Sequence, residues 1–194
     1  MQGQYILRML SGDKTVIPAV RTKDDFRYAL QNTSSPSIIL LFGDINLLPE
    51  LLARSEEYKK LLLIHLDLLE GVGKDRAGIK MLARMGVKGI ITTKSHLAKH
   101  ARAEGMLVIQ RMFVMDSEAL RTGVHVLQQF KPDAIEVLPA SVPAEVISDL
   151  VKATNLPVLG GGLLTTEADV RAALKNGLCA VSTSRRELWN NILR

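Results

Sequence analysis

Short apolar runs recur along this chain at a spacing that admits few folds. Eight runs of β-branched or aliphatic residues start about 18 to 28 residues apart, which is the length of one strand followed by one helix. They cover residues 16–20, 37–42, 61–66, 89–92, 107–110, 134–137, 157–159 and 180–182. Most of the runs are apolar at successive positions, as is typical of parallel strands that are covered on both faces.

The segments between the runs carry signals for helices. Three pairs have the spacing of a capping box, in which the first side chain accepts a hydrogen bond at a helix start: Thr22 with Asp25, Thr166 with Asp169, and Ser184 with Glu187. The last pair predicts a final helix over residues 185–193. Three glycines predict helix ends, because glycine adopts a left-handed conformation without steric cost: Gly86, Gly105 and Gly177.

Eight strand–helix units joined by right-handed crossovers close naturally into a barrel. We therefore predict an α/β protein with one compact (β/α)8 TIM-type barrel over residues 16–194, preceded by a polar, irregular lead-in segment over residues 1–15. The chain has 194 residues, fewer than the roughly 250 typical of this fold, so its helices must be short and its loops tight. The structural alternative is an open, doubly wound sheet.

The composition is that of a globular protein. No apolar run is long enough to span a bilayer, and the N-terminus lacks the apolar region of a signal peptide. The single cysteine, Cys179, lies between Leu178 and Ala180, so we expect a small buried hydrophobe and not half of a disulfide. The net charge of +5 admits a polyanionic partner without requiring one. These features predict a cytoplasmic protein with no membrane contact.

The ends of the last two predicted strands indicate an anion site. The seventh run is followed by three glycines, and the eighth ends in the sequence Ser-Thr-Ser, directly before the predicted final helix. Glycines let backbone N–H groups approach an anion, hydroxyl groups add donors, and a helix start carries a partial positive charge. Phosphate is bound after these two strands in many barrels of this class. The predicted phosphate-binding residues are Gly161, Gly162, Ser182, Thr183 and Ser184.

Polar residues also interrupt the apolar runs near the ends of other strands, where the active face of such a barrel lies. His65 and Asp67 are two positions apart, so both are expected to face the barrel interior while Ile64 and Leu66 pack under the helices. The full set predicted to line the mouth and to bind polar groups of a ligand is Asp44, His65, Asp67, Lys94, Gln110, Arg111 and Glu136. Charged members of this set would cost several kcal/mol each to bury alone, so we expect Asp67, Lys94 and Glu136 to neutralise one another or to bind a polar ligand.

These residues also have purely structural interpretations. His65 could be a core histidine bonded to a neighbouring acid, and Asp44 could cap the following helix. A glycine turn or a helix cap would account for either half of the anion site, but both halves at the correct two strands favour phosphate. His96 and His100 are four apart without a third ligand nearby, so no metal site is predicted. No nucleophile elbow, Walker loop or dinucleotide motif occurs, and no catalytic residue is assigned.

Seven motifs in order along the chain resemble those of the glycerol-3-phosphate-responsive antiterminator family. They occupy residues 41–45, 65–68 with 70–71, 89–95, 109–111, 135–139, 160–163, and 181–184 with 187–189. The resemblance runs from about residue 16 to residue 189, nearly the whole chain. One departure is Gly160, where the family commonly has a residue such as alanine, so only the following two glycines match strictly.

The resemblance implies a bacterial regulator of glycerol-uptake and glycerol-metabolism genes. Such a protein is expected to bind glycerol 3-phosphate without a cofactor and without catalysis, and to act on leader mRNA so that transcription passes a terminator. The ligand's phosphate would lie on the glycine and serine residues named above, with its hydroxyls directed toward Asp67, Lys94 and Glu136. The RNA-contacting surface is not determined by the sequence. Candidate basic clusters are residues 94–102 and the pair Arg185–Arg186.

Other functions remain open from the residues alone. A barrel enzyme acting on a small phosphorylated polyol or sugar could use Asp67 and Glu136 as an acid–base pair and Lys94 as a Schiff-base lysine. The site could also bind a different anion, such as a dicarboxylate. A homodimer is compatible with the behaviour of many barrel proteins, although no particular residue indicates one.

Overall fold

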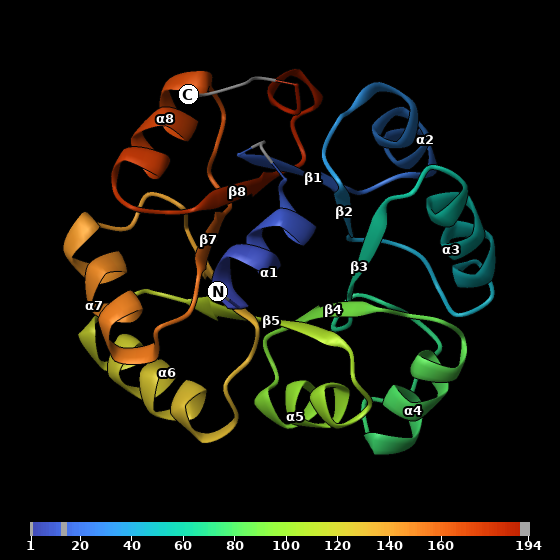
Figure 1. Cartoon of the computed structure of the whole chain (residues 1–194), viewed down its shortest axis with the longest axis horizontal. Helices are drawn as coiled ribbons and strands as arrows, with labels where there is room; N and C mark the ends of the chain where they lie inside the picture. Colours follow the sequence, from blue (N-terminus) through green and yellow to red (C-terminus); the bar gives the residue numbers. More distant parts are fainter. Residues whose placement is uncertain (1, 13–14, 191–194) are drawn as a thin grey trace.

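The computed structural model describes residues 2–12 and 15–190. It is a closed barrel of eight parallel strands in sequence order, and β8 pairs with β1 to complete the ring (Figure 1). This pairing confirms the predicted (β/α)8 barrel and excludes the open sheet. The strands are β1 (Val16–Val20), β2 (Ser37–Leu40), β3 (Leu61–His65), β4 (Gly89–Thr92), β5 (Leu107–Phe113), β6 (Ala134–Leu138), β7 (Val158–Gly161) and β8 (Ala180–Thr183).

A helix follows each strand from β1 to β7 and packs on the outside of the barrel (Figure 1). Thr166 and Asp169 form the predicted capping box, and Thr22 accepts a hydrogen bond from the backbone of Asp25 at 3.0 Å. The three glycines predicted to end helices all have positive φ. The helices are short, as the chain length requires: α2 (Lys23–Asn32), α3 (Leu48–Glu57), α4 (Arg76–Arg84), α5 (Ser95–Ala103), α6 (Ser117–Phe130), α7 (Ala144–Thr154) and α8 (Glu167–Lys175).

Alternation along the strands separates two apolar clusters. One side of each strand packs under the helices, and this outer cluster includes the predicted Ile64 and Leu66. The other side fills the barrel interior with residues such as Leu63, Ile91 and Ile109. The middle of the barrel is therefore a packed apolar core. Polar side chains lie at its ends: Ser37 begins β2 and bonds to the carbonyl of Leu10, and His65, Glu136 and Ser182 lie nearer the C-terminal ends of their strands.

The sequence predicted an irregular N-terminal segment, and this prediction is wrong. Residues Gln2–Leu10 form helix α1, which lies across the centre of the ring in Figure 1. Its Ile6 and Leu10 pack against the interior residues of the barrel, and Leu10 is fully buried. These two side chains are four positions apart and share a helix face. Residues 5–10 are apolar apart from Arg8, and this is the signal for the helix. Helix α1 thus closes the N-terminal end of the barrel.

The predicted final helix is also wrong. A single 3-10 turn, η1 (Arg186–Leu188), follows β8, and residues 191–193 of the prediction lie outside the described residues. Arg185 holds the position before this turn and makes no capping hydrogen bond with its side chain, so the predicted Ser184–Glu187 capping box does not form. The chain turns instead because buried Trp189 anchors it: the indole Nε1 donates to the carbonyl of Thr183 at 2.8 Å.

Candidate functional site

A cavity of about 330 Å³ opens at the C-terminal ends of β7, β8 and β1. This is the face at which barrels of this class bind ligands. All five residues predicted to bind phosphate line it, and so does Arg111 from the predicted mouth set. The complete lining is Ala19, Arg21, Leu41, Arg111, Leu138, Gly161, Gly162, Leu163, Leu164, Thr165, Ser182, Thr183, Ser184 and Arg185.

Two glycines shape the wall that β7 contributes. A Cβ on Gly161 would lie 2.8 Å from Ser182 Oγ and 2.9 Å from Glu136 Oε1, so any larger residue would displace the polar groups beneath the cavity. Gly162 has φ +75, a conformation that residues with a side chain rarely adopt. The backbone therefore borders the cavity directly at this point. Gly160, by contrast, packs against Leu178 and Ala140 and has a structural role.

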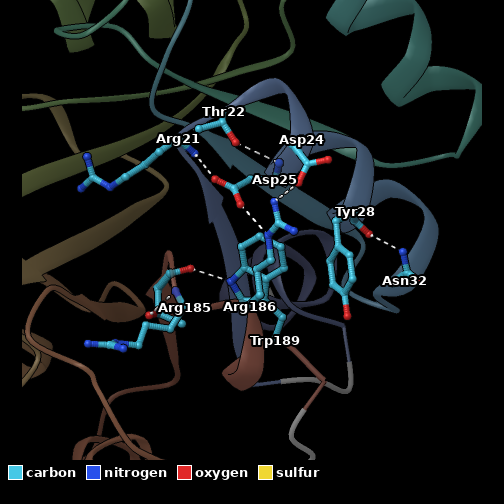
Figure 2. Close-up of polar contacts among 10 residues, drawn as sticks. Arg21, Thr22, Asp24, Asp25, Tyr28, Asn32, Arg185, Arg186 and Trp189 are labelled. Carbon is cyan, nitrogen blue, oxygen red and sulfur yellow. Dashed lines mark hydrogen bonds and ion pairs between the residues drawn. The ribbon is translucent and has the colours of Figure 1, made fainter.

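Among the residues that the structure describes, three arginines line the cavity and no acidic side chain does. Arg21 directly follows β1, Arg185 is the second residue after β8, and Arg111 lies in β5. Arg21 and Arg185 are exposed, and Figure 2 shows their side chains extending to the same side. Guanidinium groups bind phosphate and carboxylate oxygens through paired N–H donors, so the cavity is suited to a small anion.

A buried ion pair between Arg111 and Glu136 lies beneath this cavity. Glu136 is fully buried, and its Oε2 accepts a hydrogen bond from Arg111 Nε at 2.6 Å. Its Oε1 accepts from Ser182 Oγ, also at 2.6 Å. Because the proton of Ser182 is engaged by Glu136, this hydroxyl presents only its oxygen to the cavity. Charge for binding an anion therefore comes from the arginines, and Glu136 fixes the orientation of Arg111.

His65 lies in the same central layer as this pair. Its side chain is buried, and neither ring nitrogen has a hydrogen-bond partner among the described residues. Burial lowers the pKa of His65 to about 4, and the positive charge of Arg111 adds to this effect against the opposing influence of Asp67 and Glu136. His65 is therefore neutral near pH 7. The expectation that it faces the barrel interior is consistent with the interior position of Leu63 on the same strand face.

Asp67 and Lys94 do not join Glu136 in the network that the sequence analysis expected. Asp67 accepts hydrogen bonds from the Thr92 hydroxyl at 2.8 Å and from the Thr93 backbone at 2.7 Å. Burial raises the pKa of Asp67, but these hydrogen bonds outweigh it and hold the pKa below its usual value. Lys94 is exposed at the start of α5. The neighbouring threonines thus stabilise the charge of Asp67 through hydrogen bonds.

Asp44 and Gln110 satisfy backbone groups outside the cavity lining. Asp44 Oδ1 accepts from the backbone N–H groups of Asn46 at 2.7 Å and Leu47 at 3.0 Å, which stabilises the turn before α3. The Gln110 amide donates to the carbonyls of Thr92 and Thr93 at 3.1 and 2.9 Å. Among the residues predicted to line the mouth, only Arg111 therefore borders the cavity itself, while Glu136 lies beneath its lining residues Gly161 and Ser182.

The sequence analysis missed Arg21 and Arg185 as cavity residues. Arg21 is the first residue after β1 and Arg185 the second after β8, on the two strands that close the barrel. The sequence predicted Arg185 only as part of a basic pair, and it predicted no polar site residue after the first strand. The first few residues after every predicted strand include both arginines, and they are candidates because the ends of parallel strands meet at one face.

The basic clusters considered for RNA binding are partly neutralised within the protein. Arg102 pairs with Asp133 at 2.5 Å, and Arg186 pairs with two carboxylates of α2. Within residues 2–12 and 15–190 there is no group of three side chains that could hold a metal ion. No helix in the same part of the chain is both long enough and apolar enough to cross a membrane.

Comparison with known proteins identifies relatives along nearly the whole chain. The model of the glycerol-3-phosphate responsive antiterminator family matches residues 16–189. An uncharacterized protein of Escherichia coli K12, YgcP, is 33% identical over 175 residues, which are 90% of this chain and 91% of that protein.

Solved structures agree with this assignment. The glycerol uptake operon antiterminator regulatory protein of Listeria monocytogenes has a TM-score of 0.84 and 31% identity, covering 90% of this chain and 94% of that one. A glycerol uptake operon antiterminator-related protein of Thermotoga maritima has a TM-score of 0.80 and 30% identity, covering 91% and 98%. The N-acetylmannosamine-6-phosphate 2-epimerase of Clostridium perfringens, with a TM-score of 0.64, 16% identity and coverage of 92% and 88%, shares the fold alone.

Proposed function

Because this chain belongs to the glycerol-3-phosphate responsive antiterminator family, we propose that it senses glycerol 3-phosphate in the arginine-lined cavity and regulates glycerol-uptake genes by acting on their leader mRNA. The observation that carries this proposal is the set of three arginines that converge on a cavity without an acidic lining residue. A dianionic phosphate group would be stabilised between them, against the glycine wall of β7.

The polar floor supports a ligand that carries hydroxyl groups beside its phosphate. With the phosphate near Arg21 and Arg185, the rest of a three-carbon ligand would lie toward Arg111 and the oxygen of Ser182. Glu136 bonds to both of these groups and would hold them in place. The predicted contacts of hydroxyls with Asp67 and Lys94 are less favoured by this placement, because neither residue lines the cavity.

The enzyme hypothesis gains no support from the geometry of the charged side chains. A Schiff-base lysine needs a desolvated amine, whereas Lys94 is exposed. Asp67, one of the two proposed acid–base carboxylates, has a pKa held below its usual value, which makes it a weak base at neutral pH. A regulatory ligand site agrees with both observations and with the regulatory character of the family.

Glycerol 3-phosphate is expected to stabilise the protein against heat. At 100 times its dissociation constant, a ligand that binds only the folded state adds about 2.7 kcal/mol to the free energy of unfolding. Inorganic phosphate should raise the melting temperature less, and glycerol should leave it unchanged. Arg185→Gln should reduce the response, while Arg121→Gln, at an exposed pair with Glu118 on α6, should not. If neither glycerol 3-phosphate nor phosphate stabilises the wild type, the proposed ligand is wrong.

Binding to the leader RNA is expected to strengthen when glycerol 3-phosphate is present. A ligand shifts RNA binding only if it prefers the RNA-competent state. Because Arg185→Gln weakens ligand binding, the variant should show a smaller increase in RNA affinity when glycerol 3-phosphate is added, while its RNA affinity without ligand changes less. Gel shifts of the leader transcript, with an RNA of scrambled sequence as the control, measure both effects. Increasing salt should weaken the complex, because phosphate contacts release counterions. Equal binding of both RNAs, with and without ligand, would contradict the proposed regulation.

A further inference from the structure

Beside the cavity, Arg186 joins two segments that are far apart in the sequence. Its Nε donates to Asp25 Oδ1 at 2.6 Å, and its second guanidinium nitrogen pairs with Asp24. Both carboxylates lie in the first turn of α2, whereas Arg186 begins η1 after β8 (Figure 2). The contact therefore connects the segment after the last strand to the start of the helix that follows the first strand.

Two aromatic side chains, Tyr28 and Trp189, pack beside the same contact. The Arg186 guanidinium carbon lies 5.2 Å from the centre of the Tyr28 ring, and this ring lies 6.0 Å from that of Trp189. Trp189 is in turn fixed by its hydrogen bond to the carbonyl of Thr183. A planar guanidinium held by two carboxylates and an aromatic face has little freedom to rotate.

The carboxylate of Asp25 connects the two chain segments that carry Arg21 and Arg185. Asp25 Oδ1 accepts from Arg186, and Asp25 Oδ2 accepts from the backbone N–H of Arg21 at 3.4 Å. Arg185 is the residue immediately before Arg186. Figure 2 shows the side chains of Arg21 and Arg185 extending to one side and the guanidinium of Arg186 turned toward Asp24 and Asp25. Asp25 and Arg186 thus link the backbone of Arg21 to the residue next to Arg185, beyond the pairing of β1 with β8.

We propose, building on the anion site proposed above, that Arg186 is a positioning residue for the anion: it holds Arg21 and Arg185 at the spacing that binds a phosphate group. Its own charge is satisfied by Asp24 and Asp25, so it is not itself a ligand of the anion. Its single positive charge also offsets half of the charge of these two carboxylates, which would otherwise repel an anion bound beside Arg21 more strongly. Burial raises the pKa of Asp25, but hydrogen bonds led by the one from Arg186 outweigh it and keep this carboxylate charged at neutral pH.

The test compares the affinity of variants for two probes, glycerol 3-phosphate and inorganic phosphate, by calorimetric titration. Arg186→Gln is expected to raise both dissociation constants roughly tenfold, within the range of coupling between residues in contact. Arg186→Lys keeps a positive charge but lacks the planar fork that reaches both carboxylates, so it should recover part of the affinity. Arg121→Gln is the matched control, since it removes an arginine from an exposed ion pair far from the cavity in sequence, and should bind as the wild type does.

A double-mutant cycle separates positioning from a general effect on the fold. If Arg186 acts through Arg185, then Arg186→Gln should cause a much smaller loss in the Arg185→Gln background than in the wild type. An equal loss in both backgrounds, or unchanged affinity of Arg186→Gln in a protein whose wild type binds, would overturn the positioning role and leave the proposed function standing. Should Arg186→Gln fail to fold, Arg186→Lys in the same cycle decides by the same criterion. A wild type that binds neither probe would overturn both proposals.

Discussion

Replacing Arg111 with methionine is expected to lower the free energy of unfolding by about 3–5 kcal/mol, the usual cost of removing one partner of a buried ion pair. The reason lies in Glu136, whose side chain is 1% exposed and would keep only the hydrogen bond from Ser182. Methionine preserves most of the volume, so the loss reports on the charge and not on a cavity. Urea denaturation at pH 7 measures the change, and the response to glycerol 3-phosphate should disappear in the same variant.

A second substitution separates the two roles of this pair. The double variant Arg111→Met/Glu136→Leu removes both buried charges and should recover most of the stability, because apolar replacements of buried ion pairs are often neutral. It should not recover anion binding. Arg121→Met, at the exposed pair with Glu118, should change stability by less than about 1 kcal/mol. A loss below about 1 kcal/mol for Arg111→Met would show that Glu136 is compensated by other groups.

Mild acid is expected to destabilise the protein through His65. The pKa of His65 is about 4 in the folded protein and 6.5 in an unconstrained chain, so the unfolded state binds the proton first as the pH falls. The stability is complete above pH 6.5 and is lost progressively toward pH 4. Between pH 7 and pH 5 the free energy of unfolding should fall by about 2 kcal/mol from this residue alone.

His65→Gln provides the comparison, because glutamine is polar, of similar size and does not titrate in this range. Urea denaturation of both proteins at pH 7 and pH 5 gives the change in the free energy of unfolding with pH for each protein. Subtracting the change of the variant from that of the wild type removes the contributions that the two proteins share. The lower limit of pH 5 also avoids the region in which carboxylates with lowered pKa, such as Asp25 and Asp67, become protonated. Equal pH dependence of the two proteins would show that His65 is not held in its neutral form.

The barrel itself could be predicted because its strands lie in a uniform environment. Parallel strands covered on both sides require continuous apolar runs, and eight such runs at strand–helix spacing leave few arrangements. The two errors lie at the chain ends, where this repetition stops. Helix α1 precedes the first strand, so the strand–helix spacing does not mark it, although residues 5–10 are apolar apart from Arg8. The turn at Arg186–Leu188 depends on Trp189 and α2, which no local pattern reveals.

The site was predictable where it depends on the backbone and less so where it depends on long side chains. Gly161, Gly162 and the Ser-Thr-Ser segment border the cavity because their strand positions determine where they lie. The partners of charged groups could not be predicted in this way. Asp67 is compensated by Thr92 and Thr93, and Glu136 by Arg111, since the choice depends on strand register and on rotamers that bring particular atoms together.

The filled interior, closed at its lower end by helix α1, gives the barrel a kinetic property. Because Leu63, Ile91 and Ile109 fill the middle of the barrel, a molecule bound at the upper end leaves on the side from which it entered. Its residence time is then governed by the loops that follow β7, β8 and β1. A macromolecule that covers these loops would slow the release of the small molecule beneath it, so the lifetime of a regulatory complex could outlast a brief fall in the concentration of its effector.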